Sequence, residues 1–409
     1  MSFTFQCRSC GSRQGALVLD LGIQPLANNL LREQDLSQPE PKFPLQLAIC
    51  HSCWLLQITH LVPPVQLFSE YLYFSSFSDV MLRHARQAAE RYIGEFGLDQ
   101  RSLVAEVASN DGYFLQYFKA RNVPSLGIEP AANIAKVASE KGIETQVDFF
   151  SNALAKRLAG ADRQADLILG NNVFAHAPDT NDFVAGLRTL LKPRGRVVLE
   201  FPYAADFIEK TEFDTIYHEH VFYFSLTALR PLFQRHNLEI FHVERLPIHG
   251  GSMRLFAAIE GAYAVQNSVM ALLEEEKAKG VNSPSYYEGF AQRVFELKLS
   301  LMTLLGELKR KDKSIAAYGA SAKGSTLLNF FGLGKDFLGF VADRSSYKQG
   351  RLTPGTHIPI VAAEKLTEAR PDYTLLLTWN FADEILEQQR SYRQNGGKFI
   401  IPIPEVRIV

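Results

Sequence analysis

"LVAEVASNDGYFLQYF", residues 103–118, is the stretch that decides the fold of the central part of this chain. Its first half is a short apolar run of the kind that forms a buried strand, and its second half has the pattern of an amphipathic helix. A polar turn, Ser109-Asn110-Asp111-Gly112, joins the two halves. Because a buried strand followed by a helix is the repeating unit of a parallel sheet, this stretch predicts the first unit of an α/β domain.

The same alternation continues toward the C-terminus. Further strands are expected at "SLGIE" (125–129), "IETQV" (143–147), "ADLILGNN" (165–172) and "GRVVLEFP" (195–202), with helical segments between them. An antiparallel pair, "LEIFHVERL" (238–246) and "SMRLFAAIE" (252–260), closes the series. The pattern predicts a doubly wound, Rossmann-like parallel sheet with helices on both faces. Small-molecule sites in such sheets lie at the carboxyl ends of the strands.

The overall composition restricts the class of protein. The chain has 409 residues, enough for two or three domains, because a single core seldom grows beyond about 250 residues. No apolar run approaches the length of a membrane span, and the start "MSFTFQC" lacks the regions of a signal peptide. We therefore expect a cytoplasmic protein with no membrane partner. A formal net charge of −1 provides no basic footprint, so a nucleic-acid partner is not expected.

Two changes in pattern indicate domain boundaries. The first follows "THLVPPVQLF" (59–68), and the second coincides with the charge run "KRKDK" (309–313). We expect a domain over residues 1–70, a second over 71–310 and a smaller third over 311–409. A helix is expected once the chain has passed Ser78. Another should end near the second boundary, with an apolar stripe formed by Phe290, Val294, Leu297, Leu301, Leu304, Leu305 and Leu308.

The four cysteines predict a metal site in the N-terminal domain. They occur only as Cys7-x-x-Cys10 and Cys50-x-x-Cys53, separated by a segment, "LDLGIQPLANNLL" (19–31), that is rich in turn formers. Two such knuckles supply the four thiolates of a closed tetrahedral zinc site. A reducing cytosol disfavours disulfides, and a thioredoxin-like redox pair needs one CxxC rather than two. Because all four ligand positions are filled, the zinc is expected to be structural.

The polar turn after the first central strand departs from a dinucleotide-binding pattern. Such a pattern has GxGxxG, whereas Ser109, Asn110 and Asp111 fill those places here. About 20 residues on, where an acid can accept both hydroxyls of a ribose, the second strand ends in Glu129. The fourth strand ends in "GNNVFAHAPD" (170–179), which adds polar groups at the same edge. Asp and Asn also cap helices, but together these features suit a nucleoside with a sulfonium, and we predict S-adenosylmethionine as cofactor. The expected contacts are Glu106, Ser109, Asn110, Asp111, Gly112, Glu129, Pro130, Asn171 and Asn172.

"FDTIYHEHVFYF" (213–224) sets Tyr217, His218, Glu219 and His220 side by side among aromatic residues. An acid/base site, a metal site and a solvated loop are the three interpretations. His-x-His on a strand would put both rings on one face for a metal, but HEH is not HExxH and no third ligand is evident. The neighbouring aromatic residues favour a sheltered site over a solvated loop.

The C-terminal part repeats the strand and helix pattern. "SIAAYGASAKG" (314–324) is expected to be a strand entering a turn and helix, where free backbone N–H groups and Lys323 can receive a phosphate. "FLGFVADRSSYKQG" (337–350) predicts a strand ending at Asp343, and "DYTLLLTWN" (372–380) a third. A small Rossmann-like half follows. A nicotinamide oxidoreductase with Asp343 on a ribose is the main alternative, although the turn lacks GxGxxG and the basic residues after the strand suit a nucleotide diphosphate better.

The motifs, taken in order, resemble one known family. The paired knuckles, "EVASNDGYFLQYF", "GIEPA", "NNVFAHAPDTNDFVAG", "FDTIYHEHVFYFSL", "HGGSMR", "AYGASAKG" and "DRSSYKQG" follow the order seen in the sugar C-methyltransferases of deoxysugar biosynthesis, which act on nucleotide-linked 4-keto sugars. The resemblance spans nearly the whole chain. It implies a zinc-binding N-terminal domain, a central S-adenosylmethionine domain and a C-terminal domain that helps to hold the nucleotide. Ser321 stands where the family often has proline, which puts the shape of that turn in question.

The resemblance also implies roles for individual residues. The second histidine of the Tyr-His-Glu-His motif, His220, corresponds to the proposed general base of the family. Glu219 can orient an imidazole or a sugar hydroxyl, and Tyr217 can donate to a developing enolate. His176 is a further candidate for the catalytic site, but both His176 and His249 could equally be satisfied structural histidines. The segment "EYLYFSS" resembles one that closes over the active site, with Tyr71 and Ser76 expected near the cofactor. The expected substrate contacts are Tyr73, His249, Gly251, Lys323, Arg344, Tyr347, Lys348 and Asn380.

The sequence therefore predicts an S-adenosylmethionine-dependent C-methyltransferase of a nucleotide-linked keto-deoxysugar. A base removes the proton next to the ketone, and the carbanion attacks the sulfonium methyl group. The alternatives are an NAD(P)-dependent sugar-nucleotide oxidoreductase and a non-catalytic nucleotide-sugar binding protein. Pocket shape across two domains, rather than any motif, determines the sugar, the base and the ring carbon, and no motif assigns an oligomeric state.

Overall fold

The computed structural model describes residues 5–68 and 74–409, apart from the side chain of His249. In the N-terminal part, a long hairpin of β1 (Gly15–Pro25) and β2 (Lys42–Cys50) is extended by β3 (Leu56–Ile58). The fourth strand of this sheet, β9 (Phe222–Tyr223), comes from the far end of the Tyr-His-Glu-His stretch and pairs with β3. The N-terminal sheet is therefore completed by a segment of the central part.

The central part contains the doubly wound sheet that the sequence predicts. Its strand order is β10-β11-β8-β7-β4-β5-β6. The parallel strands are β4 (Val104–Val107), β5 (Ser125–Ile128), β6 (Thr145–Gln146), β7 (Ala165–Asn171) and β8 (Leu191–Pro202). The antiparallel pair is β10 (Leu238–Leu246) and β11 (Ser252–Ile259). The chain passes from β4 to β5 and β6 on one side, then returns to β7 on the other side of β4. This reversal makes the carboxyl ends of β4 and β7 a topological switch point.

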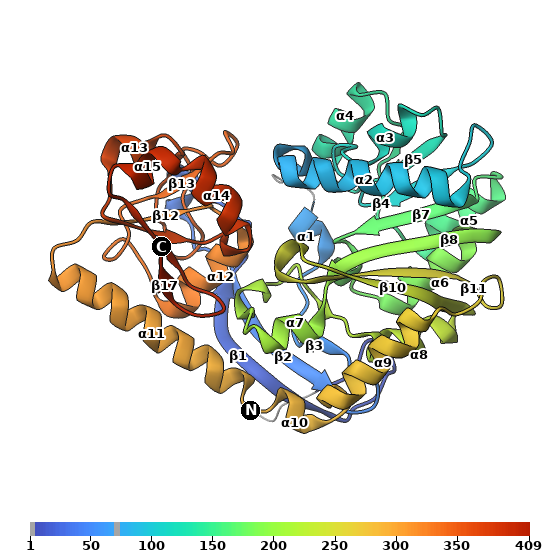
Figure 1. Cartoon of the computed structure of the whole chain (residues 1–409), viewed down its shortest axis with the longest axis horizontal. Coiled ribbons are helices and arrows are strands. Elements are labelled where there is room, and N and C mark those ends of the chain that lie inside the picture. Colours follow the sequence, from blue (N-terminus) through green and yellow to red (C-terminus); the bar gives the residue numbers. More distant parts are fainter. Residues whose placement is uncertain (1–4, 69–73) are drawn as a thin grey trace.

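Helices cover both faces of the central sheet (Figure 1). They are α2 (Asp79–Phe96), α3 (Leu115–Lys119), α4 (Ala132–Glu140), α5 (Asn152–Gly160), α6 (Thr180–Leu190), α8 (Leu226–Arg235) and α9 (Asn267–Lys279). The helix α7 (Ala204–Glu209) instead packs through Phe207 on Tyr223 and Phe290. The predicted start of α2 is confirmed, because the Ser78 hydroxyl accepts a hydrogen bond from the Met81 N–H group at 3.3 Å. Its apolar positions, from Met81 to Tyr92, are buried.

The C-terminal part repeats the architecture at a smaller scale. Its sheet has the order β14-β13-β12-β15-β16-β17 and is parallel except for the last pair. The strands are β12 (Ile315–Tyr318), β13 (Val341–Asp343), β14 (Ile360–Ala362), β15 (Tyr373–Leu376), β16 (Lys398–Ile401) and β17 (Arg407–Ile408). The helices are α12 (Ala322–Phe331), α13 (Lys365–Ala369), α14 (Ala382–Gln388) and α15 (Arg390–Gln394). A second switch point lies between β12 and β15.

One long helix joins the central and C-terminal parts. This helix, α11 (Phe290–Arg310), follows the short α10 (Pro284–Tyr287) and runs along the lower edge of the molecule in Figure 1. Another short helix, α1 (Pro64–Phe68), lies near the first predicted boundary. The predicted stripe is confirmed, since all of its members are buried except Leu304, which is half-buried. Because α11 ends at Arg310, the charge run marks the end of the helix.

Candidate functional site

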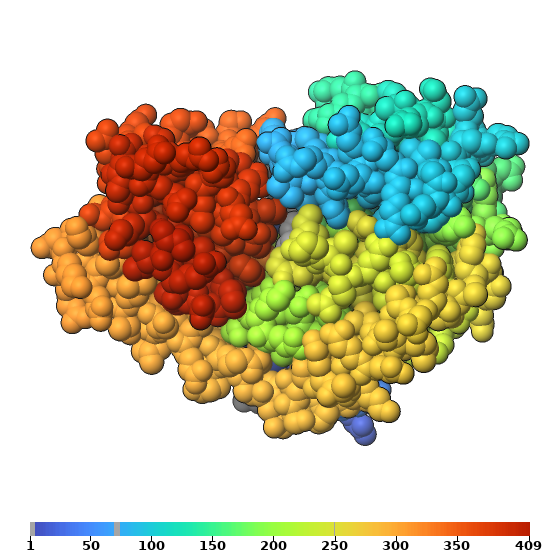
Figure 2. Space-filling model, in the orientation of Figure 1, coloured from blue at the N-terminus to red at the C-terminus, as the bar shows by residue number. Residues whose placement is uncertain are grey.

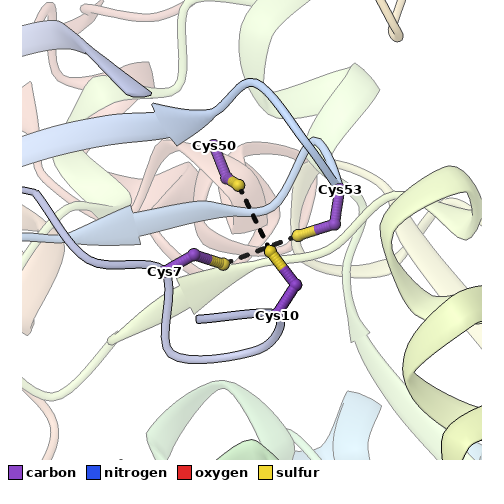
Figure 3. Close-up of side chains that lie close together, drawn as sticks. All are labelled: Cys7, Cys10, Cys50 and Cys53. Carbon is purple, nitrogen blue, oxygen red and sulfur yellow. Dashed lines mark hydrogen bonds between the residues drawn. The ribbon is translucent and has the colours of Figure 1, made fainter. Parts of the chain in front are cut away.

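The four cysteines converge at one end of the N-terminal sheet (Figure 3). The Sγ atoms of Cys7 and Cys53 are 3.5 Å apart and those of Cys10 and Cys50 are 3.6 Å apart. All four sulfur atoms lie within 4.8 Å of one another. A tetrahedral Zn²⁺ with Zn–S bonds of about 2.3 Å needs neighbouring sulfur atoms about 3.8 Å apart, so the observed spacing fits this ion.

The two knuckles have matching backbone geometry. The N–H group of Gly11 donates to the Cys7 carbonyl at 2.9 Å, and that of Trp54 donates to the Cys50 carbonyl at 3.0 Å. Gly11 and Trp54, each following the second cysteine of its knuckle, adopt positive φ angles of 74° and 60°. These left-handed residues turn each chain back so that both thiols of a knuckle face the same point.

A cavity of about 630 Å³ lies where the three parts of the chain meet. The carboxyl ends of β4, β5 and β7 form one end, and the residues after β12 and β15 form the other. Asn28, Asn29 and Leu30 close one side from the N-terminal part. In the space-filling view, the orange and red C-terminal part packs against the light-blue start of α2 (Figure 2). A ring stack supports this contact, because Phe74 and Tyr347 have centroids 4.9 Å apart.

Glu129 is fixed at the central end of the cavity by backbone groups. Its Oε2 atom accepts from the Asn110 N–H group at 3.0 Å and its Oε1 atom from the Ala131 N–H group at 2.9 Å. Burial of this carboxyl, which is 5% exposed, raises its pKa. The Asn110 side chain accepts from the Ser75 N–H group at 2.9 Å, which ties the start of α2 to the same turn. Glu129, Pro130 and Asn110 line the cavity, and their contact with the cofactor stays a prediction.

Other predicted cofactor residues support the turn from behind. Glu106, Ser109, Asp111 and Gly112 are buried and are not among the lining residues of the described chain. Asp111 accepts from the Ser76 hydroxyl and from Lys141 Nζ, the latter at 3.1 Å. Burial, with Asp111 and Glu129 nearby, raises the pKa of Glu106 well above its usual range. These residues therefore hold the turn in shape rather than face the cavity.

The end of β7 brings His176 to the Tyr-His-Glu-His stretch. Asn171, Asn172 and His176 all line the cavity. Asn172 has a φ angle of 53°, and its N–H group donates to the Glu200 carbonyl at 2.7 Å. The His176 ring lies edge-on to the His220 ring, with centroids 4.9 Å apart. Burial lowers the pKa of His176 to about 4, so its imidazole is neutral at neutral pH.

The Tyr-His-Glu-His stretch is a turn in which His220 faces the cavity. Its Nδ1 atom is 2.9 Å from the Thr215 carbonyl, which can only accept, so Nδ1 carries the proton. Nε2 is therefore unprotonated, and it accepts a hydrogen bond from the Tyr217 hydroxyl at 2.7 Å. Tyr217, Glu219 and His220 all line the cavity.

His218 points the other way. Its Nε2 atom is 3.2 Å from the Pro44 carbonyl of the N-terminal part, and the side chain is buried. Burial lowers the pKa of His218 to about 4. The two-histidine metal interpretation is wrong for this reason: the stretch forms a turn before β9, so the rings of His218 and His220 do not share one face.

The C-terminal end of the cavity carries two lysines. Lys323, one residue into α12, places Nζ 4.8 Å from the centre of the Trp379 ring, and this atom has no hydrogen-bond partner among the described residues. Lys348 donates to the Ala320 carbonyl at 2.8 Å. Both lysines and Asn380 line the cavity. The Ser321 hydroxyl accepts from the Gly324 N–H group at 3.1 Å, so serine here caps α12.

Several predicted substrate contacts lie elsewhere or are not described. Arg344 is exposed outside the cavity lining of the described chain, and Tyr347 stacks on Phe74. Gly251, at φ 145°, packs against Asp206 so closely that an added Cβ would lie 2.1 Å from the carboxylate oxygen. Tyr71, Tyr73 and the side chain of His249 fall outside the described residues.

The structure adds one side chain that the sequence did not suggest. Asn28 Nδ2 donates to both carboxylate oxygens of Glu219, at 2.8 and 2.9 Å. These residues are 191 positions apart, so no spacing pattern links them. Asp343, assigned to a ribose in the oxidoreductase alternative, instead accepts from the N–H groups of Ala320 and Ser345 at 2.7 and 2.8 Å.

Comparisons with known proteins agree with this architecture. Three family models match the chain: "Putative zinc binding domain" at residues 7–68, "Methyltransferase domain" at 81–243 and "C-methyltransferase C-terminal domain" at 247–404. C-methyltransferase NovU of Streptomyces niveus is 37% identical over 405 residues, covering 99% of this chain and 96% of that protein.

Two solved methyltransferase structures match less than half of the chain. Magnesium protoporphyrin IX methyltransferase from Synechocystis PCC 6803, with bound SAM, is 13% identical with a TM-score of 0.33, covering 45% of this chain and 82% of that one. The CcbJ methyltransferase from Streptomyces caelestis is also 13% identical, with a TM-score of 0.34 and coverages of 43% and 90%. Among the described residues, none of the helices combines the length and apolarity needed to span a membrane. Because a 37% identical C-methyltransferase matches nearly the full length, this chain belongs to the family of S-adenosylmethionine-dependent C-methyltransferases.

Proposed function

We propose that this enzyme methylates a carbon next to the ketone of a nucleotide-linked keto-deoxysugar, in the cytoplasm, with His220 as the general base. One observation carries the proposal: a single cavity joins the Glu129 end, the Tyr217–His220 turn and the Lys323 end. Family membership argues against the oxidoreductase and binding-protein alternatives, because the relatives are methyltransferases.

The Glu129 end suits the cofactor. S-adenosylmethionine supplies an electrophilic methyl group when it is bound. Glu129 can accept ribose hydroxyls, since its orientation is already set by the N–H groups of Asn110 and Ala131. Asn171 and Asn172 offer polar groups at the neighbouring strand end.

The catalytic turn suits removal of a proton from carbon. Nε2 of His220 is unprotonated. Once the Tyr217 hydroxyl turns from Nε2 to the ketone oxygen, Nε2 takes the proton from the C–H bond next to the ketone, while the electron pair of that bond moves toward the ketone oxygen. The hydrogen bond from Nδ1 to the Thr215 carbonyl stabilises the imidazolium that forms. The Tyr217 hydroxyl is next to Nε2, so a substrate carbon that approaches Nε2 brings its ketone oxygen near this hydroxyl. The hydroxyl can then donate to the developing enolate oxygen instead of to Nε2.

Transfer of the methyl group follows removal of the proton. The enolate carbon then forms a bond to the methyl carbon, and the bond between that carbon and sulfur breaks, which leaves the sulfur neutral. The proton on His220 returns to solvent. Neutral His176, against the His220 ring, adds no charge that would oppose formation of the imidazolium.

The Lys323 end suits the nucleotide part of the substrate. Nζ of Lys323 has no hydrogen-bond partner among the described residues, although its charge interacts with the nearby carboxyl groups of Glu212 and Asp214. Lys348 also lines the cavity, and it donates to the Ala320 carbonyl just before α12. Free backbone N–H groups at a helix start attract anions. A diphosphate placed here would leave the sugar toward the centre of the cavity.

The test is transfer of a labelled methyl group from S-adenosylmethionine to a panel of acceptors. The panel contains thymidine, uridine and guanosine diphosphate 4-keto-6-deoxyhexoses, the matching 4-hydroxy sugars and simple ketones. We expect label in at least one keto-sugar nucleotide and none in its 4-hydroxy counterpart, because only the ketone acidifies the neighbouring C–H bond. Label transferred to oxygen or nitrogen, or only to ketones without a nucleotide, would overturn the proposal.

A further inference from the structure

Asn28 reaches the active site from the N-terminal part of the chain. It lies in the loop after β1, and its Nδ2 atom donates to both oxygens of Glu219, at 2.8 and 2.9 Å. Both side chains line the cavity. Glu219 is only 3% exposed, so its carboxylate depends on protein groups rather than bulk water for its orientation.

The loop that carries Asn28 is held in place at a second point. Leu31 and Leu352 exchange two backbone hydrogen bonds of 3.0 and 2.8 Å, which attach the loop to the C-terminal part. Farther along the same segment, the Glu40 carboxylate accepts from the Gly355 N–H group at 2.9 Å. Asn28 therefore stands on a segment attached to the part of the enzyme that carries Lys323 and Lys348.

An amide at this position has a specific chemical consequence. Its NH₂ group can only donate, so it binds the ionised form of Glu219 and opposes protonation of the carboxyl group. The amide is also neutral, so the negative charge of Glu219 stays available to a substrate hydroxyl or to a nearby imidazole. A carboxylate at position 28 would repel Glu219, and an alanine would leave Glu219 with one donor fewer.

We propose that Asn28 is a positioning residue that holds the Glu219 carboxylate toward the substrate, so that the zinc-binding part of the chain contributes directly to the active site. This inference rests on the proposed function, in which Glu219 orients the substrate or the His220 ring. It goes beyond that function by assigning the residue that fixes Glu219.

The experiment compares Asn28→Asp and Asn28→Ala with a matched control, Gln46→Glu. Gln46 donates to Asp20 at 2.8 Å, which is also an amide-to-carboxylate bond of the N-terminal sheet, but it lies on the surface outside the cavity. The assay uses the full-length, zinc-loaded protein and the keto-deoxyhexose nucleotide of the panel that accepts a methyl group. It records kcat and KM between pH 6 and 9, with thermal midpoints and S-adenosylhomocysteine affinity measured to confirm folding.

We expect Asn28→Ala to lower kcat by about 10-fold to 100-fold, the effect of losing one hydrogen bond to a charged group. Asn28→Asp should lose more at pH 8. Its ratio to the parent should recover as the pH falls, because two facing carboxyl groups can share one proton. Asn28→Ala adds no charge to the cavity, so its pH profile is the reference for the pH dependence that the other groups of the site produce. Gln46→Glu should match the parent throughout.

The Glu219→Gln variant separates the inference from the function on which it rests. If Glu219→Gln lowers kcat while both Asn28 variants stay within twofold of the parent, the assignment of Asn28 is wrong and the proposed function stands. If Glu219→Gln itself leaves kcat unchanged, the role of Glu219 fails, and the inference fails with it. A constant, pH-independent ratio for Asn28→Asp would also overturn the inference, because a merely structural defect has no reason to follow the sharing of a proton.

Discussion

Two regions of the cavity are built in different ways: the Glu129 end, which we propose to be the cofactor end, and the Tyr217–His220 turn, which we propose to be the catalytic turn. At the cofactor end, Glu129, Asn110, Ala131 and Ser75 bond to one another within the central part of the chain. The catalytic turn and the residues before it take their partners from other parts: Asn28 for Glu219, Pro44 for His218, Thr326 for Ile216 and Trp379 for Asp214. The cofactor end is thus self-contained, whereas the catalytic turn depends on all three parts being assembled.

His220→Ala should produce the largest effect, and it should change the catalytic turn without changing the cofactor end. General-base catalysis is worth about 100-fold to 10,000-fold, so turnover should fall by that factor while S-adenosylhomocysteine binds normally. Exchange of the acidic sugar proton with deuterated water, in the presence of S-adenosylhomocysteine, measures the proton step alone. His218→Gln is the matched control and should exchange at close to the parental rate. Normal exchange in His220→Ala would place the base elsewhere, with His176 the next candidate.

Loss of the metal should disturb the catalytic turn more than the cofactor end. In Cys53→Ser the zinc content should drop, and the thermal midpoint should fall because metal binding contributes to folding. Since β3 pairs with β9 next to His220, turnover should decline more than S-adenosylhomocysteine affinity. Metal analysis, calorimetry and initial rates measure the three quantities. Full stability and activity after zinc removal would contradict the structural role.

Glu129→Ala should affect the cofactor end alone. Two hydrogen bonds to a charged group, each worth about 1.5 to 3 kcal/mol, are at stake if Glu129 binds both ribose hydroxyls. Calorimetry should show weaker binding of S-adenosylmethionine, with unchanged KM for the keto-sugar nucleotide. Glu144→Ala serves as the control, because Glu144 is an exposed glutamate that pairs with Arg163 on the surface. Unaltered cofactor affinity would remove Glu129 from the site.

Lys323→Ala should raise KM for the nucleotide substrate more than it lowers kcat. A diphosphate contact is remote from the reacting carbon and similar in the ground and transition states, so its loss weakens both equally. Steady-state kinetics at saturating S-adenosylmethionine measure the two constants. A decrease in kcat with normal KM would instead tie Lys323 to the catalytic turn.

The smallest effect concerns the acid stability of the two interior histidines. Burial lowers the pKa values of His218 and His176 to about 4, below the unfolded value of about 6.5. The unfolded chain therefore binds more protons between these pH values, and stability is full above about pH 6.5 and falls as the pH drops toward 4. His218→Gln should make the loss of unfolding free energy between pH 7 and pH 5 smaller, as measured by urea denaturation. An identical pH dependence in the variant would show that His218 does not contribute.

Much of the fold could be predicted because it follows local patterns. The period and length of the apolar pattern predicted β4, β5, β7 and α2, and the two CxxC knuckles predicted the metal site. The segment of turn formers between the knuckles was harder to interpret, because most of it lies in the long strand β1. Register shifts after Leu17 and Asp20, with Gly22 at φ 75°, show that the first turn formers of this segment lie in a bulged strand, whereas Asn28 lies in the loop that follows it.

The sequence by itself determined which chemical groups are present: four thiolates in two knuckles, acids at strand ends and a cluster of Tyr, His and Glu. Such signals are local, since a ligand spacing or a strand period extends over only a few residues. Only the tertiary structure decided where these groups point. It turned His220 into the cavity and His218 toward Pro44, and it brought Asn28 to Glu219. These outcomes depend on packing between segments nearly 200 residues apart in the chain, and no short-range pattern contains that information.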